Sequence, residues 1–426
     1  MANVLLTIFW GLVVLLILVL VHEWGHFIAA RKFGARVTEF MIGMPGPNIG
    51  FERNGCRYGI TCIPLGGYNR ITGMEGGEED ENLEQVLAYT YRHGSVDVEH
   101  VAAGCGISED DADFSLAVLD GWGSINKPGR SNKTDKWCAP KTETLALGEP
   151  REVQDPKALL DSERAQTYRG LSFGQRLVTL FAGPFMNILF AVILLLVALC
   201  GVGMSYTTTT IDSFSDGSPA AEAGLQVGDT ITSVDGTEVE SLSGVRSILN
   251  EKSAGDVVEV DYTRDGSSYA ASVKLADDGN GNPILGVLGT VDQYRMSPVD
   301  ALQSSWNMLV LTVQAYANLF NPSTAAETLS QSSSVVGISI VAKQAADTGI
   351  FNLLIIMAVV SLSLGVVNLV PVPPLDGGKI VTECIEKVMR KPVSVKVINA
   401  TTMVFIALML IFFVYMVRQD IFNFIL

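Results

Sequence analysis

The chain has 426 residues and a formal net charge of −16, and 48% of its residues are hydrophobic. This length suits two or three soluble domains or a multi-span membrane protein with one soluble module, and the mean hydropathy of +0.33 favours the second. The negative charge argues against a nucleic-acid partner on electrostatic grounds. The six cysteines are scattered without a Cys-x-x-Cys pair, which fits neither a zinc knuckle nor a disulfide framework.

Four apolar stretches are predicted to be membrane-spanning helices: 4–21, 181–202, 353–370 and 397–417. The first would be ~27 Å long as a helix, which is close to the thickness of the hydrocarbon core. It has neither a basic amino-terminal region nor an Ala-x-Ala site, which argues against a cleaved signal peptide.

Basic residues near the ends of the spans predict their orientation. Arg31, Lys32 and Arg36 follow the first span. Five more lie between the third and fourth spans: Lys379, Lys387, Arg390, Lys391 and Lys396. Segments 31–175 and 377–396 are therefore predicted to be cytoplasmic, and both termini and 203–350 to be extracytoplasmic.

The segment 297–320 is ambiguous. It opens with a Ser-Pro-x-Asp helix start and has an apolar middle interrupted by Gln and Asn. An amphipathic helix on the outer membrane surface is favoured over a fifth span, which would invert the orientation of everything after it.

The segment His22-Glu23-Trp24-Gly25-His26, after the first apolar stretch, carries the residue types of a hydrolytic metal site. Residues four apart project from one face of a helix, so both imidazoles can bind one ion. Two histidines, a carboxylate from elsewhere and a water molecule form a hydrolytic zinc site. Glu23 can take the proton of the metal-bound water as general base. Ionisable residues at the end of a span are costly without a function, which argues against a simple helix cap.

Asp376 is the predicted third ligand. It lies just after the third predicted helix and ends the segment Asn-Leu-Val-Pro-Val-Pro-Pro-Leu-Asp, which starts at Asn368. The prolines cannot continue a helix, and an extended segment at membrane depth is tolerated only inside protein or beside a water-filled cavity. Such a segment would hold Asp376 against the histidines and admit water, and Gly377 and Gly378 would allow a tight return.

These two elements, HExxH and Asn-x-x-Pro-x-Pro-x-Leu-Asp-Gly-Gly, resemble those of the bacterial site-2 protease family of intramembrane zinc metalloproteases. Two more segments are similar to that family. Residues 63–74, Ile-Pro-Leu-Gly-Gly-Tyr-Asn-Arg-Ile-Thr-Gly-Met, resemble its membrane-associated β-hairpin. Residues 181–187, Phe-Ala-Gly-Pro-Phe-Met-Asn, resemble the motif that opens its second span.

The resemblance implies one Zn²⁺ ion held by His22, His26 and Asp376, with Glu23 as general base. It suggests four substrate-positioning candidates: Asn368, Gly66, Gly67 and Asn187. Of these, Asn368 is alternatively a candidate for stabilising the oxyanion. The implied substrates are transmembrane segments of single-pass proteins, such as anti-sigma factors or remnant signal peptides, cut in regulated intramembrane proteolysis. The implied location is a bacterial plasma membrane, with the active site toward the cytoplasm.

The segment 58–72 is predicted to bind substrate. A peptide bond inside a helix is shielded, and pairing an unwound substrate with an exposed strand replaces its lost hydrogen bonds. A simple cytoplasmic hairpin without this role is the alternative.

Residues 206–292 are predicted to form an α+β PDZ domain. Short β runs alternate with turns, and Ala-Gly-Leu-x-x-Gly-Asp at 223–229 is followed by Val-Asp-Gly. PDZ domains bind peptides by strand addition. Peptide binding and steric exclusion of bulky substrate ectodomains both remain open.

Residues 78–165 form an acidic insert. Between residues 78 and 164 there are 19 acidic and 9 basic side chains, and the acidity argues against DNA binding. Two short helices are expected in 95–122, where Ser108 opens a capping box. The stretch 123–157 is expected to be a flexible linker, so the insert is interpreted as a tethered regulatory or partner-binding element.

The predicted fold is an α-helical polytopic membrane protein with four transmembrane helices, a membrane-associated β-hairpin and an inserted PDZ domain. Its segments are 1–77 with the zinc motif and hairpin, 78–165 with the insert, 166–205 with the second span, 206–292 with the PDZ domain, 293–350 with the amphipathic helix and a linker, and 351–426 with the last two spans and the third ligand. A membrane scaffold or transporter with a structural His–Glu site is the competing class. Glu23 argues against it, because a scaffold needs no base beside the ligands.

Overall fold

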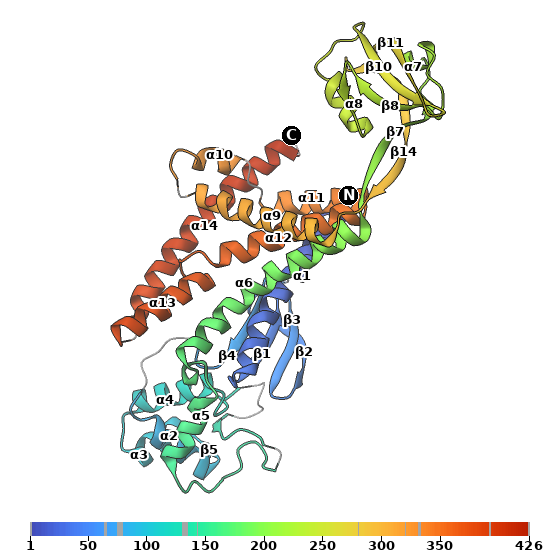
Figure 1. Cartoon of the computed structure of the whole chain (residues 1–426). Helices are drawn as coiled ribbons and strands as arrows, with labels where there is room; N and C mark the ends of the chain where they lie inside the picture. The colour runs from blue at the N-terminus through green and yellow to red at the C-terminus, as the bar shows by residue number, and fades with distance from the viewer. Residues whose placement is uncertain are drawn as a thin grey trace. The chain divides into compact units, whose positions relative to one another are not determined.

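The structure, a computed structural model, describes residues 2–63, 66–74, 80–129, 135–142, 144–279, 281–319, 321–330, 334–391 and 393–424. The chain divides into two compact units. The first comprises Met1–Leu195 and Gln303–Leu426, and the second comprises Leu196–Leu302. Figure 1 shows the elements of each unit.

Four helices of the described chain are long and apolar enough to cross a membrane, which confirms the four predicted spans. They are α1 (Ala2–Lys32), α6 (Phe173–Leu196), α12 (Ile350–Asn368) and α14 (Val395–Phe424). A helix satisfies its backbone hydrogen bonds internally, as lipid requires. α6 continues into a stretch of π-helix (Val197–Val202), and α13 (Asp376–Met389) connects α12 to α14.

The segment 297–320 forms helix α9 (Pro298–Asn318), which is not among the four candidate spans of the described chain. Its interspersed Gln and Asn side chains lower its hydropathy below that of a span. The placement of α9 on the outer membrane surface stays a prediction.

The region 321–350, predicted as a linker, instead contains α10 (Ala325–Ser330) and α11 (Val335–Thr348). Asp420 of α14 is 1% exposed and caps α11, accepting hydrogen bonds from the N–H groups of Ser334 (2.8 Å) and Gly337 (3.0 Å). A carboxylate there satisfies free N–H groups and complements the helix dipole. This long-range contact is invisible in the local sequence, which explains the missed helix.

A four-stranded sheet follows α1. Its strands are β1 (Val37–Ile42), β2 (Asn48–Arg53), β3 (Cys56–Thr61) and β4 (Gly67–Ile71), in the order β2-β3-β1-β4. β1 lies between β3 and β4, so the predicted hairpin across 58–72 is wrong. The hairpin lies one strand earlier, because Asn54 and Gly55 have the positive φ angles, 51° and 70°, that a two-residue turn between β2 and β3 requires.

The insert has its own hydrophobic core. Its elements are α2 (Leu83–His93), β5 (Ser95–Val96), α3 (Val98–Cys105), α4 (Glu109–Gly121), β6 (Trp137–Cys138) and α5 (Pro156–Ala165). Val86, Leu87 and Leu116 are among its fully buried side chains. The two helices expected in 95–122 are α3 and α4, and the Ser108 hydroxyl accepts the Asp111 N–H as the capping box predicts.

The prediction of a flexible linker at 123–157 is wrong for its described part. β6 pairs with β5, and the Arg151 guanidinium lies 4.6 Å from the centroid of the Tyr91 ring. Arg36 also ties the insert to the end of α1 by donating to the Gly123 carbonyl at 2.7 Å and pairing with Glu163 at 3.1 Å. Polar composition predicted a loop here, and tertiary contacts order it. Residues 130–134 and 143 lie outside the described residues.

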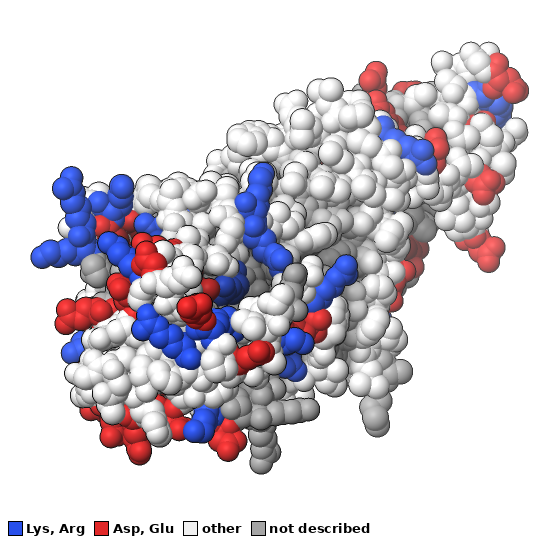
Figure 2. All heavy atoms as spheres, turned by 90° about the horizontal axis from the view of Figure 1, so that it is seen from below, with Lys and Arg blue, Asp and Glu red and all other residues white. Residues whose placement is uncertain are grey.

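Charged side chains are unevenly distributed over the first unit. On the face seen in Figure 2, Lys, Arg, Asp and Glu gather over the end that carries the insert and the α13–α14 connection. A broad uncharged band lies beside them. Such a band is what a membrane-spanning bundle presents to lipid.

The second unit is an α+β module. Its strands are β7 (Met204–Phe214), β8 (Thr230–Val234), β9 (Thr237–Glu238), β10 (Val257–Arg264), β11 (Ser267–Lys274), β12 (Ala276–Asp277), β13 (Pro283–Ile284) and β14 (Val287–Tyr294), and its helices are α7 (Pro219–Glu222) and α8 (Leu242–Leu249). The main sheet has the order β11-β10-β8-β7-β14. The core includes Ile211 and Ile231 together with Val258, Val260 and Tyr262, which alternate along β10 and so point inward.

A buried ion pair organises this module. Asp229, from the predicted Gly-Asp motif, is 1% exposed and accepts two hydrogen bonds at 2.7 Å from Arg264 and one from the Gln226 N–H. The Arg264 hydrogen bonds hold the pKa of Asp229 below its usual value. A carboxyl whose folded pKa is depressed contributes stability above its unfolded pKa, and that contribution is lost as the pH falls through the folded pKa.

We predict that Asp229→Asn destabilises residues 204–294 produced as a separate domain. Because Asn leaves Arg264 without a charged partner, the midpoint of thermal unfolding at pH 7 should fall by on the order of 10 °C. Calorimetry from pH 7 to pH 3 should show a difference from wild type that shrinks on acidification. The exposed Asp212→Asn is the control, and equal midpoints for both variants would contradict the prediction.

Candidate functional site

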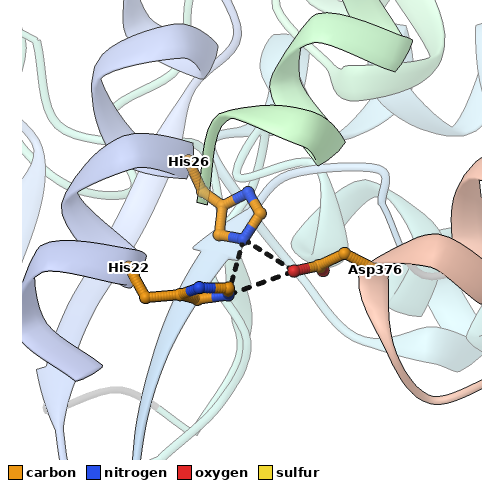
Figure 3. Close-up of side chains that lie close together, drawn as sticks. All are labelled: His22, His26 and Asp376. Carbon is orange, nitrogen blue, oxygen red and sulfur yellow. Dashed lines mark hydrogen bonds and ion pairs between the residues drawn. The ribbon is translucent and has the colours of Figure 1, made fainter. Parts of the chain in front are cut away.

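His22 and His26 lie one turn apart on α1 and are both buried, with 8% and 6% of their surface exposed. Their ring centroids are 4.9 Å apart in a T-shaped arrangement. Figure 3 shows both rings directed toward the same point, where Asp376 approaches from the opposite side. Four-residue spacing on a helix produces this convergence, as the sequence predicts.

Asp376 is the first residue of α13, and it is buried. The segment before it, 369–375, is a succession of turns rather than the predicted extended segment. Gly377 and Gly378 make these turns possible, because a Cβ on either would collide with backbone atoms of Leu369 or Pro373. The glycines thus bring α13 against the end of α12 and direct the carboxylate of Asp376 at the histidines.

The three side chains meet in a near-equilateral triangle. His22 Nε2 lies 3.1 Å from Asp376 Oδ2, and His26 Nε2 lies 3.2 Å from both His22 Nε2 and Asp376 Oδ2. Donors ~2.0–2.2 Å from one ion at tetrahedral angles are about 3.3–3.6 Å apart. The triangle therefore has nearly the dimensions of three corners of a tetrahedral zinc site. These residues also form the group of possible metal ligands found in the described chain.

The hydrogen bonds of the outer ring nitrogens favour a cation at this point. His26 Nδ1 lies 2.8 Å from the carbonyl oxygen of Thr179, which only accepts hydrogen bonds, so Nδ1 carries the proton. In the neutral imidazole this leaves a lone pair on Nε2, directed at His22 and Asp376. Lone pairs converging with a carboxylate oxygen repel one another unless a positive ion lies between them. The chemistry of these residues therefore fits a zinc ion.

Asn187 on α6 is fully buried beside His22, with its amide 3.2 Å from His22 Nδ1. For His22 to direct a lone pair inward from Nε2, its Nδ1 must donate, and an Asn187 side chain with the amide reversed presents Oδ1 as the acceptor. A second contact fixes this helix, because the Ser361 hydroxyl donates to the Asn187 carbonyl at 2.8 Å. Asn187 thus lies against a histidine, and its substrate-positioning role stays a prediction.

Glycines let α1 and α6 approach closely enough for these contacts. A Cβ on Gly183 would collide with the His26 ring, and a Cβ on Gly25 would collide with the Ala182 carbonyl. The imidazole of His26 therefore rests on the bare backbone of α6, which explains the small residue in the 181–187 motif.

Glu23 is held by a residue that the sequence did not single out. The Asn69 amide on β4 donates to Glu23 Oε2 at 2.8 Å and also to the Glu23 carbonyl. Neither Asn69 nor Thr179 carries a local signal, although Asn69 lies within the 63–74 segment. A backbone carbonyl such as that of Thr179 has no sequence signature at all.

The remaining candidates lie apart from the triangle. Asn368 ends α12 and donates to its own helix at the Leu364 carbonyl, 2.9 Å away. Gly66 has a φ of 94°, and its carbonyl accepts the Gly43 N–H at 2.8 Å. Gly67 opens β4 so close to α1 that a Cβ would lie 3.2 Å from Glu23 Cγ. Their substrate-positioning role stays a prediction.

Comparison with known proteins identifies the family. The model of peptidase family M50 matches residues 10–412, a range that contains the histidines and Asp376. The chain belongs to peptidase family M50. This match confirms the resemblance to the site-2 protease family that the sequence motifs indicate.

Two relatives illustrate the similarity. Zinc metalloprotease RasP of Shouchella clausii is 28% identical over 430 residues, covering 95% of this chain and 96% of the relative. Zinc metalloprotease RasP of Oceanobacillus iheyensis is 28% identical over 408 residues, covering 89% and 90%. The M50 chain is accordingly a zinc metalloprotease with helices that can span a membrane.

Solved structures match a smaller part of the M50 protease. The PDZ domain of the SdrC-like protein from Listeria monocytogenes is 31% identical, with a TM-score of 0.18, covering 19% of this chain and 86% of that domain. The corresponding domain from Listeria innocua has the same identity and TM-score and is covered to 92%.

We predict that Asn187→Leu weakens zinc binding by the M50 protease about 10–100-fold, because the His22 N–H loses its acceptor. Asn187→Asp should bind zinc within about threefold of wild type, since a carboxylate accepts the same hydrogen bond. Competition against a chromogenic chelator measures both affinities. Equal losses in the two variants would contradict the prediction, because Asp keeps both the volume of Asn and an acceptor oxygen.

Proposed function

We propose that this M50 protease hydrolyses peptide bonds within transmembrane segments of single-pass membrane proteins. In this proposal His22, His26 and Asp376 hold one zinc ion, and Glu23 is the general base. The observation that carries the proposal is the triangle of donor atoms 3.1–3.2 Å apart, built on a helix apolar enough to cross a membrane. A hydrolytic centre on such a helix suits a substrate that is itself in the bilayer.

When bound, zinc would supply Lewis acidity and lower the pKa of a water molecule to ~7. The residues of this chain orient the general base, Glu23, and its carboxylate receives the proton. Glu23 follows His22 directly in the sequence, and the Asn69 amide fixes its Oε2. The other carboxylate oxygen is left to accept the proton of the attacking water and to return it to the leaving amine.

Strand β4 supports a role in binding unwound substrate. It is the edge strand of the sheet β2-β3-β1-β4 and carries Gly67 and Asn69, both in contact with α1 near Glu23. A substrate segment added to this edge would run beside the base and exchange its helical hydrogen bonds for strand pairing. The substrate-binding role predicted for the segment 58–72 is therefore proposed for the edge strand β4.

Exposed apolar side chains on strands β2 and β3 support contact of the sheet with lipid. Ile49 and Phe51 on β2 are 86% and 64% exposed, and Ile60 on β3 is also exposed. Exposed apolar side chains clustered on one edge mark a membrane or protein contact. The site would then lie where the bilayer meets water on the cytoplasmic side.

The identity of the substrates and the role of the second unit follow from the family resemblance. Anti-sigma factors and remnant signal peptides have the single apolar helix that the proposed site requires. The module could add a peptide strand or exclude proteins with bulky ectodomains. The insert is proposed to regulate the enzyme or to bind a partner as a docked domain, since its described part packs against the end of α1.

We predict that Glu23→Gln reduces cleavage of a membrane-embedded single-pass substrate by at least about 100-fold while zinc binding persists, because Gln cannot accept the proton. Asp376→Ala should lose both zinc and activity, since it removes a ligand. Purified protein in lipid nanodiscs, analysed for metal content and for cleavage, tests both expectations. Asp212→Asn in the second unit is the control with a charge change outside the site.

Two outcomes would contradict this mechanism. Wild-type cleavage by Glu23→Gln would exclude the general-base role. Full zinc content in Asp376→Ala would exclude this carboxylate as the third ligand.

The proposed orientation predicts thiol accessibility in cells. Cys62 and Cys384 are exposed and belong to the predicted cytoplasmic side, whereas Ser267 is exposed on the second unit. In variants with a single cysteine, Ser267→Cys should react with a membrane-impermeant maleimide in spheroplasts. Cys62 and Cys384 should react only after permeabilisation, and the reverse pattern would contradict the orientation.

A further inference from the structure

Helix α13 carries Asp376 yet has little apolar packing to hold it. All of its residues are described, and the buried ones are Asp376, Gly377, Gly378 and Glu383. Four of its apolar residues, Val381, Ile385, Val388 and Met389, are exposed, and only Ile380 is half-buried and packs against a hydrophobic cluster of the first unit. Apolar packing through this single side chain leaves the rotation and register of the helix to other contacts.

Ion pairs, in addition to this limited apolar packing, hold α13 in position. Glu383 is 6% exposed and lies 2.9 Å from Arg176 and 4.0 Å from Arg169. Glu386, one turn closer to α14, lies 2.6 Å from Arg169. The cluster contains two cations and two anions, so each buried carboxylate has a charged partner, as burial of a charge requires.

The spacing of these residues connects the cluster to the metal site. Asp376 and Glu383 are seven residues apart, which places both on the face of α13 that meets the rest of the unit. On α6, Arg176 lies three residues before Thr179, whose carbonyl accepts the hydrogen bond of His26. One helix, α6, therefore contacts His26, His22 and, through Arg176, the helix that carries the third ligand.

We infer that the Arg169–Arg176–Glu383–Glu386 cluster positions Asp376 for zinc binding. The inference rests on the proposed role of Asp376 as a ligand. Without Glu383, α13 keeps its covalent connection and its two buried glycines but loses the contact that sets its rotation and axial register against α6. A carboxylate displaced by a fraction of an ångström from the histidines no longer completes the site.

The test is a double-mutant cycle in the full-length protein in lipid nanodiscs. Zinc affinity is measured by chelator competition for Glu383→Gln, Arg176→Gln and the double variant, with Lys391→Gln, an exposed side chain just after α13, as the matched control. Each single variant should weaken zinc binding about 10–100-fold, as is common for partners of metal ligands. The double variant should lose little more than a single one, because either change breaks the same contact.

Cobalt spectra separate positioning from simple loss of stability. At saturating Co²⁺, Glu383→Gln should show altered d–d absorption, because the carboxylate no longer binds with its native geometry, whereas Lys391→Gln should match wild type. If Glu383→Gln does not fold, Glu386→Gln takes its place and should weaken zinc binding at least threefold. Wild-type affinity and spectrum in these variants would overturn the inference.

The result for Asp376→Ala distinguishes the two proposals. If that variant loses zinc while Glu383→Gln retains wild-type affinity, the ligand assignment stands and the positioning inference fails. If Asp376→Ala retains zinc, the ligand assignment fails first, and a loss in Glu383→Gln would have another cause.

Discussion

The structure depends on one electrostatic constraint: two imidazole nitrogens and a carboxylate oxygen converge within 3.2 Å of one another at the end of an apolar helix. In a medium of low dielectric, unpaired polar groups cost several kcal/mol each, on the order of 2–7 kcal/mol for a neutral group. Such a cluster is tolerated only if its outer atoms are hydrogen-bonded and its centre is positive. The surrounding elements provide the first condition, and a zinc ion held as proposed would provide the second.

Helix α6 meets most of the first condition. The Thr179 carbonyl and the Asn187 amide contact the two histidines from the same helix, and Gly183 lets the His26 ring approach its backbone. Thr179 and Asn187 are eight residues apart, just over two turns, so both groups lie on one side of the helix. A substitution of Gly183 would push His26 away and disturb both helices at once. α6 is thus a scaffold for the site as well as a span.

The third ligand is held in a different way from the first two. The histidines are buried side chains on the long helix α1, whereas Asp376 begins a short helix whose apolar side chains, apart from the half-buried Ile380, are exposed. Hydrophobic burial is not directional, and ion pairs fix orientation better than they add stability. A helix seated by charges can be set accurately at one end while its outer face meets lipid or solvent. The two kinds of anchoring therefore suit the two halves of the site.

The sequence by itself determined the spans, the His22–His26 pair and the choice of Asp376, because periodicity, apolar length and residue chemistry are local properties. Only the tertiary structure decided the strand order that replaced the expected hairpin, the helix α11 in an expected linker and the order within the insert. It also revealed the hydrogen bonds of Asn69 to Glu23 and of His26 to the Thr179 carbonyl. It further showed that Glu383, on the same helix as Asp376, is paired with arginine. Each of these depends on contacts between residues far apart in the chain, which no local pattern records.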